Sequence, residues 1–462
     1  MGFGDGARKS LKVSEVKVTS MPKLKELYNR AEDYKLCLKQ RNMEAIIPKF
    51  EEGLNKYKEL KDLNIQLQGL RERKNKLSAE YHRTKKSELL EESKKVKSEI
   101  MLLEEKVKKI QEEIEKIELL LPNWILSDVP IGYGDELEKP IKYVGIPKVW
   151  EKYQTEFEKM HPQVKYEVIT YEPFHHYNLV GKFISQEEAG KIAMARFYYL
   201  FDELVFLVFA LTMYAIEFFK EKGYADKFMI TPYLIKRNIE EKITYFEAFQ
   251  DTIFEVEKDN LVLIPSSEHA ILAYYMNTVF DPNELPYRIM AWSPCFRREA
   301  GAHGKDTKGI FRVRQFHKLE LHSIVKKDED VAETYKAVND VQEFLSSLGL
   351  PNRAVIVPSG DMDRRALLQI DVETWFPAEG KYRETHSIAT MGVWVSEKLN
   401  IKYRLPKGRK ELVRNIYATG VAIERLICAI AENNYDPNTR TIKIPEPLQK
   451  YMMGIKETHL GD

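Results

Sequence analysis

An apolar repeat with a period of 3.5 residues runs through the first quarter of the chain and constrains its fold more than any other feature. The repeat is carried by Leu60, Leu63, Leu67, Leu70 and Leu77 and, after a polar break at residues 82–88, by Val96, Ile100, Leu103, Val107, Ile110, Ile114 and Ile117. A sustained 3.5-residue period is typical of coiled coils, and two such helices joined by a short polar turn predict an antiparallel hairpin. We expect it between about residues 50 and 121, with helices about 40 Å long and Pro122 ending the second.

The same repeat also occurs in coiled coils that join two chains. Here the polar break lies midway between two seams of similar length, and each seam is short for an interface between separate chains. Both features favour a hairpin that folds on itself. Residues 71–109 contain thirteen Lys and Arg against eight Asp and Glu. Such a surface can bind a phosphate backbone, although charged helix surfaces are usually only solvated.

The composition is that of a long and nearly neutral chain. Its 462 residues include 72 Lys and Arg against 71 Asp and Glu, and the 44% that are hydrophobic are enough for the cores of two or three domains. The three cysteines, Cys37, Cys295 and Cys428, lie far apart. We therefore expect no disulfide framework and a reducing, cytoplasmic location.

No segment has the pattern of a membrane span or a secretory signal. The most apolar run, Leu204–Ile216, is bounded by charged residues at both ends. A membrane span needs about 20 apolar residues, so this run predicts a buried helix. The first ten residues contain no apolar core, and we expect no signal peptide there.

The sequence pattern changes after Pro122, where short β-rich runs alternate with helical segments. Strands are expected at Leu261–Ile264, Tyr287–Ser293, Phe311–Ile324, Arg353–Val357 and Ile370–Phe376, and helices at Leu204–Glu221, Asp330–Leu348 and Gly420–Glu432. Strands linked mostly by hairpins or long excursions predict an α+β fold built on an antiparallel sheet with flanking helices.

One predicted β-hairpin, formed by Tyr287–Glu299 and Phe311–His322, concentrates unusual chemistry. Alternate residues of a strand share a face. One face of the second strand carries Arg312, Arg314, Phe316, Lys318 and Glu320, the other carries Phe311, Val313, Gln315, His317, Leu319 and Leu321, and one face of the first strand carries Ser293, Cys295, Arg297 and Glu299. Arginines neutralise phosphates, a phenyl ring stacks on a base and a carboxylate binds an ammonium, which is the mixture that an adenylate-forming site needs. Any one of these residues alone could instead belong to ordinary cross-strand ion pairs.

The hairpin sequence SPCFRREAGAHGKDTKGIFRVRQFHKLEL closely resembles the second signature motif of the seryl-tRNA synthetases, a family of class II aminoacyl-tRNA synthetases. Three further segments resemble other parts of that family: IPSSEHA at 264–270, IDVETWFPAEGKYRETHS at 370–387 and YATGVAIERLICAIAEN at 417–433. Pro232 fits the proline of the first motif, which in the family lies at a dimer interface. The resemblance implies a tRNA-binding domain at residues 1–125, with the hairpin as its arm, and a class II catalytic domain at 126–462.

The resemblance also implies roles for individual residues. Arg297 would bridge the α-phosphate of ATP and the serine carboxylate, Glu299 would lie on the adenine side, and Phe316 would stack on adenine. Arg312 and Arg425 would hold the outer phosphates. The ATP-binding set further includes Arg298, Glu384, Thr385, His386 and Ser387, with Glu384 and Ser387 as Mg²⁺ ligands; the serine-binding set is Ser266, Ser267, Glu268, Arg297, Glu320 and Thr419.

The function implied is that of a serine–tRNA ligase, which activates L-serine with ATP and Mg²⁺ and then transfers serine to the 3′ end of tRNA(Ser). The serine carboxylate is already an ionised nucleophile, so the first step needs placement and charge stabilisation more than a general base. The resemblance further implies a homodimer in which the helical arm recognises tRNA through its backbone shape. No membrane partner is expected.

Several positions depart from the family pattern on the amino-acid side. Tyr417 and Ala418 stand where the family usually has Asn-Gly or Asn-Ser, and Ser266 stands where it commonly has Thr. The segments IATMGVWVSEK at 388–398 and GDMDRRALLQ at 360–369 also differ from it. These departures keep an alternative open, a divergent paralogue with altered amino-acid specificity or with no activity, acting as an RNA-binding or assembly protein. A ligase that loads a carrier protein is disfavoured because it would not need the arm.

Other residues give weaker signals. His175 and His176 are adjacent, which does not place two metal ligands on one face, so we expect surface or loop histidines. Cys295 and Cys428 are expected to be small core residues beside the site. A loop with Gly301, Gly304, Lys305, Lys308 and Gly309 is either a simple hairpin tip or, as in the family, a contact for the tRNA acceptor end.

Overall fold

The computed structural model describes residues 22–244, 250–299 and 306–459. The chain divides into two compact units, the first ending at Trp124 and the second beginning at Ile125. Each unit is described by itself.

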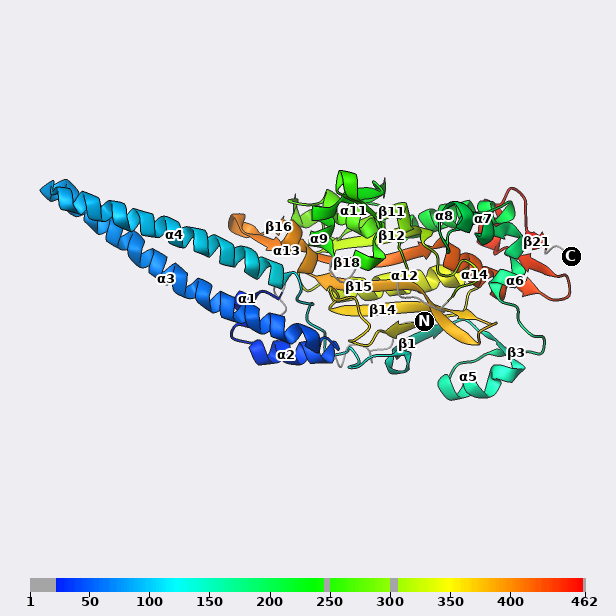
Figure 1. Cartoon of the computed structure of the whole chain (residues 1–462). Helices are drawn as coiled ribbons and strands as arrows, with labels where there is room; N and C mark the ends of the chain where they lie inside the picture. Colours follow the sequence, from blue (N-terminus) through cyan, green and yellow to red (C-terminus); the bar gives the residue numbers. More distant parts are fainter. Residues whose placement is uncertain (1–21, 245–249, 300–305, 460–462) are drawn as a thin grey trace. The chain divides into compact units, whose positions relative to one another are not determined.

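The first unit contains the predicted helical hairpin (Figure 1). Its long helices are α3 (Ile47–Thr84) and α4 (Ser87–Glu118), and they run side by side in opposite directions. Lys85, in a left-handed backbone conformation, ends α3 at the polar break. The helices have 38 and 32 residues, so they are longer than expected, and α4 ends four residues before Pro122. The prediction of an antiparallel hairpin is confirmed.

The hairpin is held by an apolar seam and by ion pairs across it. The seam residues Leu67, Leu77, Val96 and Ile100 form one buried cluster. Ion pairs join α3 to α4 at Lys56–Glu113 and Arg71–Glu104, both 2.7 Å, and at Arg73–Glu92. These contacts lie within one chain, which supports the interpretation of a hairpin that folds on itself.

Two short helices pack at the open end of the hairpin. They are α1 (Leu24–Leu27) and α2 (Ala31–Gln40). A glycine allows this close packing: a Cβ at Gly53 would lie 2.8 Å from a methyl carbon of Leu24 and 2.9 Å from a methyl carbon of Ile117. The hydroxyl of Tyr34 donates to the carbonyl of Pro122 at 2.7 Å, which ties α2 to the segment after α4.

The second unit is built on an eight-stranded sheet in the order β1-β13-β14-β15-β18-β12-β11-β6. The strands are β1 (Lys139–Val144), β13 (Asn352–Ile356), β14 (Leu368–Phe376), β15 (Lys381–Gly392), β18 (Arg414–Ala422), β12 (Gln315–Val325), β11 (Tyr287–Phe296) and β6 (Lys227–Ile230). All neighbours are antiparallel except β6, which joins β11 in parallel at one edge. Every residue of β14 is buried, so both faces of the sheet are covered at its centre.

Helices α8 (Glu203–Glu221), α12 (Asp330–Ser347) and α14 (Ile423–Asn433) are the longest in this unit and pack on the sheet (Figure 1). The smaller helices are α5 (Gln154–Met160), α6 (His176–Leu179), α7 (Gln186–Ile192), α9 (Arg237–Ile243), α11 (Ser267–Tyr274), α13 (Trp394–Leu399) and α15 (Glu446–Gln449). The minor strands are β2 (Lys148–Trp150), β3 (Glu167–Ile169), β4 (Ile184–Ser185), β5 (Tyr199–Leu200), β7 (Leu234–Lys236), β8 (Glu255–Val256), β9 (Leu261–Leu263), β10 (Val279–Phe280), β16 (Lys402–Arg404), β17 (Lys410–Leu412), β19 (Tyr435–Asp436), β20 (Thr441–Lys443) and β21 (Glu457–His459). The predicted α+β class with an antiparallel sheet is confirmed.

Two predicted boundaries are wrong. The strand expected from Phe311 begins only at Gln315, because the backbone bends through residues 311–314 before it joins the sheet. The helix expected from Gly420 begins at Ile423, because β18 continues to Ala422. A Cβ at Gly420 would lie 3.1 Å from the carbonyl oxygen of Leu319 on β12, so close approach between strands is the reason for glycine there.

The apolar run in α8 is a helix with one buried and one exposed side. Leu204, Leu207 and Leu211 are buried, whereas Phe209 and Met213 are 60% and 49% exposed. Within the described ranges, no helix combines the length and the apolar character that crossing a membrane requires.

Candidate active site

A cavity of about 440 Å³ opens in the second unit above the centre of the sheet. Its walls come from β12, β15 and β18, from the first turns of α11 and α14, and from loops that follow β11 and precede β14. Segments far apart in the sequence therefore meet at one place, and their side chains divide the cavity into a cationic end and a carboxylate-rich end.

An extra residue in β15 decides which of its side chains reach the cavity. The pairing of β15 with β14 skips Thr385. Such a bulge shifts the alternation of side chains, so Glu384 and Ser387, three residues apart, both line the cavity. His386 is fully buried outside the cavity lining, and burial lowers its pKa to about 3, which keeps the ring neutral.

A second bulge has the same effect in β18. The pairing of β18 with β12 skips Gly420. Thr419 and Ala422, again three residues apart, both line the cavity, and Arg425 follows one turn later in α14. The two bulges thus turn two hydroxyls, of Ser387 and Thr419, and the carboxylate of Glu384 toward the same space.

The cationic end is formed by three arginines. Arg297 lies just after β11, Arg312 lies before β12, and Arg425 lies in the first turn of α14. Arg312 is ion-paired with Glu299, and Arg425 is ion-paired with Glu384 at 3.3 Å. Two of the three guanidinium groups therefore already hold a carboxylate partner that a phosphate group can replace.

Aromatic rings lie between these cations. The guanidinium carbon of Arg297 is 5.2 Å from the centre of the Phe316 ring. The Phe311 ring lies 3.6 Å from the guanidinium carbon of Arg383 and 4.9 Å from that of Arg425. Cation–π contacts of this kind fix both the ring and the cation, and they leave flat surfaces on which a base can stack.

Side chains with oxygen atoms that can bind a cation lie on β14 and β15 next to Arg425. Gln369 donates to Asp371 at 3.0 Å and to the hydroxyl of Ser387 at 3.1 Å. Burial, with the nearby charge of Glu384 adding to it, raises the pKa of Asp371 well above its usual range. In the part of the chain that the structure describes, no group of three or more His, Cys, Asp or Glu side chains is arranged to hold a metal ion by itself.

A first polar cluster, at the carboxylate-rich end of the cavity, joins β12 to the start of α11. Ser266 caps α11, because its hydroxyl accepts from the backbone N–H of Glu268 at 3.2 Å. The ammonium of Lys318 donates to Ser266 at 2.9 Å and is ion-paired with Glu320 at 2.5 Å. Burial raises the pKa of Glu320, and its Oε1 atom is buried with no hydrogen-bond partner among the described residues. That atom can accept a further hydrogen bond.

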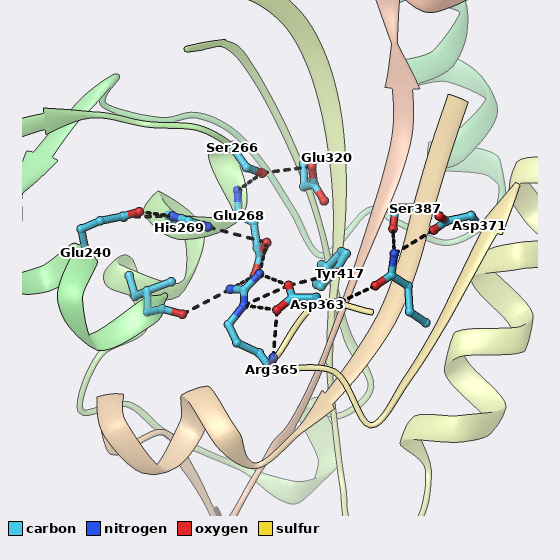
Figure 2. A network of polar contacts seen from close by, with 12 residues as sticks. Glu240, Ser266, Glu268, His269, Glu320, Asp363, Arg365, Asp371, Ser387 and Tyr417 are labelled. Atoms are coloured by element: carbon cyan, nitrogen blue, oxygen red, sulfur yellow. Dashed lines mark hydrogen bonds and ion pairs between the residues drawn. The ribbon is translucent and has the colours of Figure 1, made fainter. Parts of the chain in front are cut away.

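A second polar cluster contains Glu268, Asp363, Arg365 and Tyr417 (Figure 2). The guanidinium of Arg365 is ion-paired with Glu268 at 2.9 Å and with Asp363 at 2.7 Å. The hydroxyl of Tyr417 donates to Asp363 at 3.4 Å. Burial raises the pKa of the Glu268 carboxyl, but the groups that lower it, Arg365 first and then His269, together outweigh burial, so the pKa falls below its usual value and Glu268 is ionised.

Comparisons with known proteins match this architecture over most of the chain. Residues 21–125 match the family described as Seryl-tRNA synthetase N-terminal domain, and residues 252–434 match the tRNA synthetase class II core domain (G, H, P, S and T). A serine–tRNA ligase of Hyperthermus butylicus is 39% identical over 372 residues, which cover 79% of this chain and 80% of that protein. One from Picrophilus torridus is 37% identical over 426 residues, covering 90% of this chain and 94% of that protein. The chain belongs to the seryl-tRNA synthetases.

Solved structures of the family agree with the fold of the chain. The seryl-tRNA synthetase from Pyrococcus horikoshii complexed with ATP superimposes with a TM-score of 0.90 at 32% identity, covering 95% of this chain and 99% of that one. The cytoplasmic serine–tRNA ligase from Naegleria fowleri in complex with AMP gives a TM-score of 0.79 at 27% identity, covering 93% and 96%. The family predicted from the sequence motifs is therefore confirmed.

The structure brings most of the predicted site residues of this seryl-tRNA synthetase into one cavity. Those that line it are Ser266, Glu268, Arg297, Glu299, Arg312, Phe316, Glu384, Thr385, Ser387, Thr419 and Arg425. Glu320 lies directly behind Ser266 and Lys318, in contact with both. Their roles toward ATP, serine and Mg²⁺ stay predictions.

Besides Glu320, three predicted residues do not line the cavity. Arg298 is exposed, and its backbone N–H donates to the carbonyl of Thr252 at 2.7 Å. Ser267 is buried inside the first turn of α11. His386 points to the opposite side of β15 because of the bulge at Thr385. Each of them neighbours a residue that does line the cavity.

The predicted alternation along the second strand of the hairpin is wrong before Gln315. Arg314 does not line the cavity, and its guanidinium contacts the sulfur of Met194 at 3.0 Å. Phe311 and Val313, predicted to lie on the opposite face of the strand from Arg312, also line the cavity. The cause is the bend at residues 311–314, where a period of two residues does not apply.

Sequence reasoning missed Asp363 and Arg365 as site residues. Both lie in the segment 360–369, which was noted only because it departs from the family pattern. It also missed Glu424, whose carboxylate accepts from the backbone N–H of His317 at 2.9 Å and from the hydroxyl of Tyr198 at 2.5 Å. The sequence signal for Glu424 was its position beside Arg425, since two adjacent charged residues stand there at the start of an otherwise apolar helix.

The weaker sequence signals have mixed outcomes. His176 is buried rather than on the surface, because Glu432 accepts from its backbone N–H at 3.0 Å and contacts its Nδ1 at 3.1 Å. Cys295 and Cys428 are buried, as predicted, and their thiols are free. Gly301, Gly304 and Lys305 lie outside the described residues.

Proposed function

We propose that the chain is an ATP-dependent serine–tRNA ligase that converts L-serine and ATP to seryl-adenylate and then transfers serine to tRNA(Ser). The observation that carries this proposal is the convergence of Arg297, Arg312 and Arg425 with Phe316 and Glu384 around one cavity. This combination suits a molecule with phosphates and a flat base. The family membership, which spans both the N-terminal unit and the catalytic core, supports the same function over a divergent or inactive paralogue.

The chain's own residues would activate serine mainly by placement. Arg297 would bind the α-phosphate and the serine carboxylate together, so that the nucleophile lies in line with the phosphorus. Arg312 and Arg425 would leave Glu299 and Glu384 to bind the outer phosphates, and this exchange of partners stabilises the charge that spreads in the transition state. Phe316 would support the adenine ring.

The residues at β15 fit Mg²⁺. The ion binds proteins through one or two oxygen side chains and completes its shell with water and substrate phosphates. Glu384 and the hydroxyl of Ser387 offer such a pair. Bound Mg²⁺ would neutralise phosphate charge. Glu384 would then serve the metal, and the guanidinium of Arg425 would be released toward ATP.

The carboxylate-rich end of the cavity would bind serine. Ser266 and Thr419 line it and can hydrogen-bond to the serine hydroxyl. Glu320, behind Ser266, has an Oε1 atom with no hydrogen-bond partner among the described residues, and this atom would accept from the substrate. Discrimination by hydrogen bonding to a small hydroxyl is strong only when the site's own polar atoms would otherwise be unpaired. Glu320 meets that condition.

We also propose a homodimer in the cytoplasm, with the helical arm binding the tRNA. Phe209 and Met213 on α8, and Phe228 and Ile230 on the edge strand β6, are 48–67% exposed, which suits a surface covered by a second copy. The arm carries an excess of Lys and Arg between residues 71 and 109, which suits a phosphate backbone. In this proposal residues 1–125 form the tRNA-binding domain and residues 126–462 the catalytic domain.

Amino-acid-dependent exchange of pyrophosphate into ATP, run with each of the twenty amino acids, tests the function. We expect exchange with serine above all others. Deleting residues 60–117 should leave this exchange intact and abolish the charging of tRNA(Ser). No exchange with any amino acid would contradict the ligase, and equal loss of both activities in the deletion would contradict the role of the arm.

A further inference from the structure

The segment 306–312 carries two residues of the cationic end of the cavity but belongs to no helix or strand. Phe311 and Arg312 line the cavity, whereas Asp306 lies outside its lining. A segment without the regular hydrogen bonds of a helix or sheet depends for its order on contacts with neighbouring elements. The positions of Phe311 and Arg312 are therefore set by the side chains that hold this segment.

Arg383 on β15 contacts this segment at two points. Its Nη2 donates to both carboxylate oxygens of Asp306, at 2.7 Å each, and its guanidinium carbon lies 3.6 Å from the centre of the Phe311 ring. Its Nη1 donates to the carboxylate of Glu379 at 2.6 Å, which holds the guanidinium from its own side. One guanidinium thus joins Asp306 and Phe311, and both contacts are of the strong, charge-dependent kinds.

The Phe311 ring links Arg383 to the cationic end of the cavity. The ring is buried, lies edge-to-face with Phe376 at 5.3 Å, and has its centre 4.9 Å from the guanidinium carbon of Arg425. Arg312 follows Phe311 directly in the chain. A shift of the Phe311 ring would therefore move the backbone that carries Arg312 and remove a contact of Arg425.

A second anchor of the segment lies at Gly309. The side-chain amide of Gln186 donates to the Gly309 carbonyl at 2.9 Å. The backbone of Gly309 has a φ of +73°, and a Cβ there would lie 2.2 Å from Nε2 of His176, so only glycine fits. This close approach shows that the segment is packed in one defined position, to which Arg383 supplies the charged contact.

We propose that Arg383 is a positioning residue for ATP. By holding Asp306 and Phe311 it fixes the segment 306–312, so that the Arg312 guanidinium stays at the cationic end of the cavity. The inference rests on the proposed binding of ATP in this cavity. Arg383 itself does not line the cavity, so it acts on the nucleotide only through the residues that it holds.

The test compares Arg383→Met, Arg383→Lys and Asp306→Asn. It measures Kd for ATP with Mg²⁺ by calorimetry, and KM for ATP and for serine in pyrophosphate exchange. Misplacement of a binding group by about 1 Å can lower the rate about 100-fold. We therefore expect kcat/KM for ATP to fall by about 10- to 100-fold in Arg383→Met, with a matching rise in Kd for ATP and an unchanged KM for serine.

The other variants separate the two contacts of Arg383. Arg383→Lys keeps the charge but loses the planar fork and the stacking, so its loss should be smaller than that of Arg383→Met. Asp306→Asn removes only the ion pair and should also weaken ATP binding, although Asp306 lies outside the cavity lining. Adding Asp306→Asn to Arg383→Met should cause little further loss, because the ion pair is already absent.

Arg353→Met is the matched control. Arg353 also joins two carboxylates, Glu138 at 2.8 Å and Glu373, and its guanidinium carbon lies 5.4 Å from the centre of the Tyr382 ring. None of these four residues lines the cavity. The substitution should lower the free energy of unfolding and leave Kd and KM for ATP unchanged.

The outcomes separate this inference from the proposed function. A wild-type protein that binds no ATP would overturn both. A wild-type protein that binds ATP but supports no exchange with any amino acid would contradict the ligase, and the Kd values of the variants would still decide the inference. A folded Arg383→Met variant with the wild-type Kd and kcat/KM for ATP would overturn the inference alone, as would an equal shift in Arg353→Met. If Arg383→Met does not fold, Arg383→Lys and Asp306→Asn decide the question.

Discussion

Replacing Arg297 with alanine is the sharpest test of the cationic end of the cavity. The backbone N–H of Arg297 donates to the carbonyl of Arg314 at 2.9 Å, so the main chain is held independently of the side chain. The guanidinium carbon lies 5.2 Å from the centre of the Phe316 ring, at the cavity wall. The substitution therefore removes one cation and leaves the hairpin hydrogen bond in place.

The expected loss follows from the contacts that Arg297 would make. A hydrogen bond to a charged group contributes about 1.5–3 kcal/mol, and two of them, to the α-phosphate and to the serine carboxylate, amount to about 3–6 kcal/mol. Each 1.36 kcal/mol is a factor of ten in rate, so kcat/KM should fall by about 10²–10⁴. Arg297→Lys keeps the charge but loses the planar fork and should recover only part of the loss.

Serine-dependent pyrophosphate exchange measures this loss. Arg404→Ala is the control, because Arg404 is an exposed residue on β16 outside the cavity lining, and its replacement removes the same charge. Surface substitutions of this kind change stability by about 0.5 kcal/mol or less. An Arg297→Ala variant that retains the exchange rate of Arg404→Ala would refute the assignment of Arg297 to the reacting groups.

Three further outcomes are expected. Phe316→Ala should raise KM for ATP by about 10-fold, because stacking on a base contributes about 1–3 kcal/mol, and leave kcat nearly unchanged in the same exchange assay. Burial raises the pKa of Glu138 to about 8; because the folded state binds this proton more tightly than the unfolded chain does, stability should fall as pH rises from about 4.5 to 8, and urea unfolding of Glu138→Gln should lack that slope. Gly53→Val should destabilise the N-terminal unit by about 1–3 kcal/mol in thermal unfolding, because its Cβ would press on Leu24 and Ile117.

The helical hairpin could be predicted closely because its information is local. The seam residues Leu67, Leu77, Val96 and Ile100 repeat at helical spacing, and the same residues form the buried cluster. The turn at Lys85 lies inside the polar break. Only the predicted ends of the helices were wrong, because residues outside the apolar repeat extend α3 toward its N-terminus.

The cavity was predicted less completely because its lining depends on irregular backbone. A strand pattern with a period of two residues cannot place Glu384 and Ser387 on one face, and the bulge at Thr385 that does so has no signature in the sequence. The same holds for the bend at residues 311–314, which turns Arg314 away. Family motifs supplied these residues where the physical pattern alone could not.

The ion pairs already present at the cationic end explain how such a site can exist before its substrates arrive. Three guanidinium groups around one cavity would repel each other and destabilise the fold if none had a partner. Arg312 with Glu299 and Arg425 with Glu384 reduce that repulsion. In the proposed mechanism, ATP binding would exchange the carboxylate oxygens on Arg312 and Arg425 for phosphate oxygens, so both arginines would stay near their working positions.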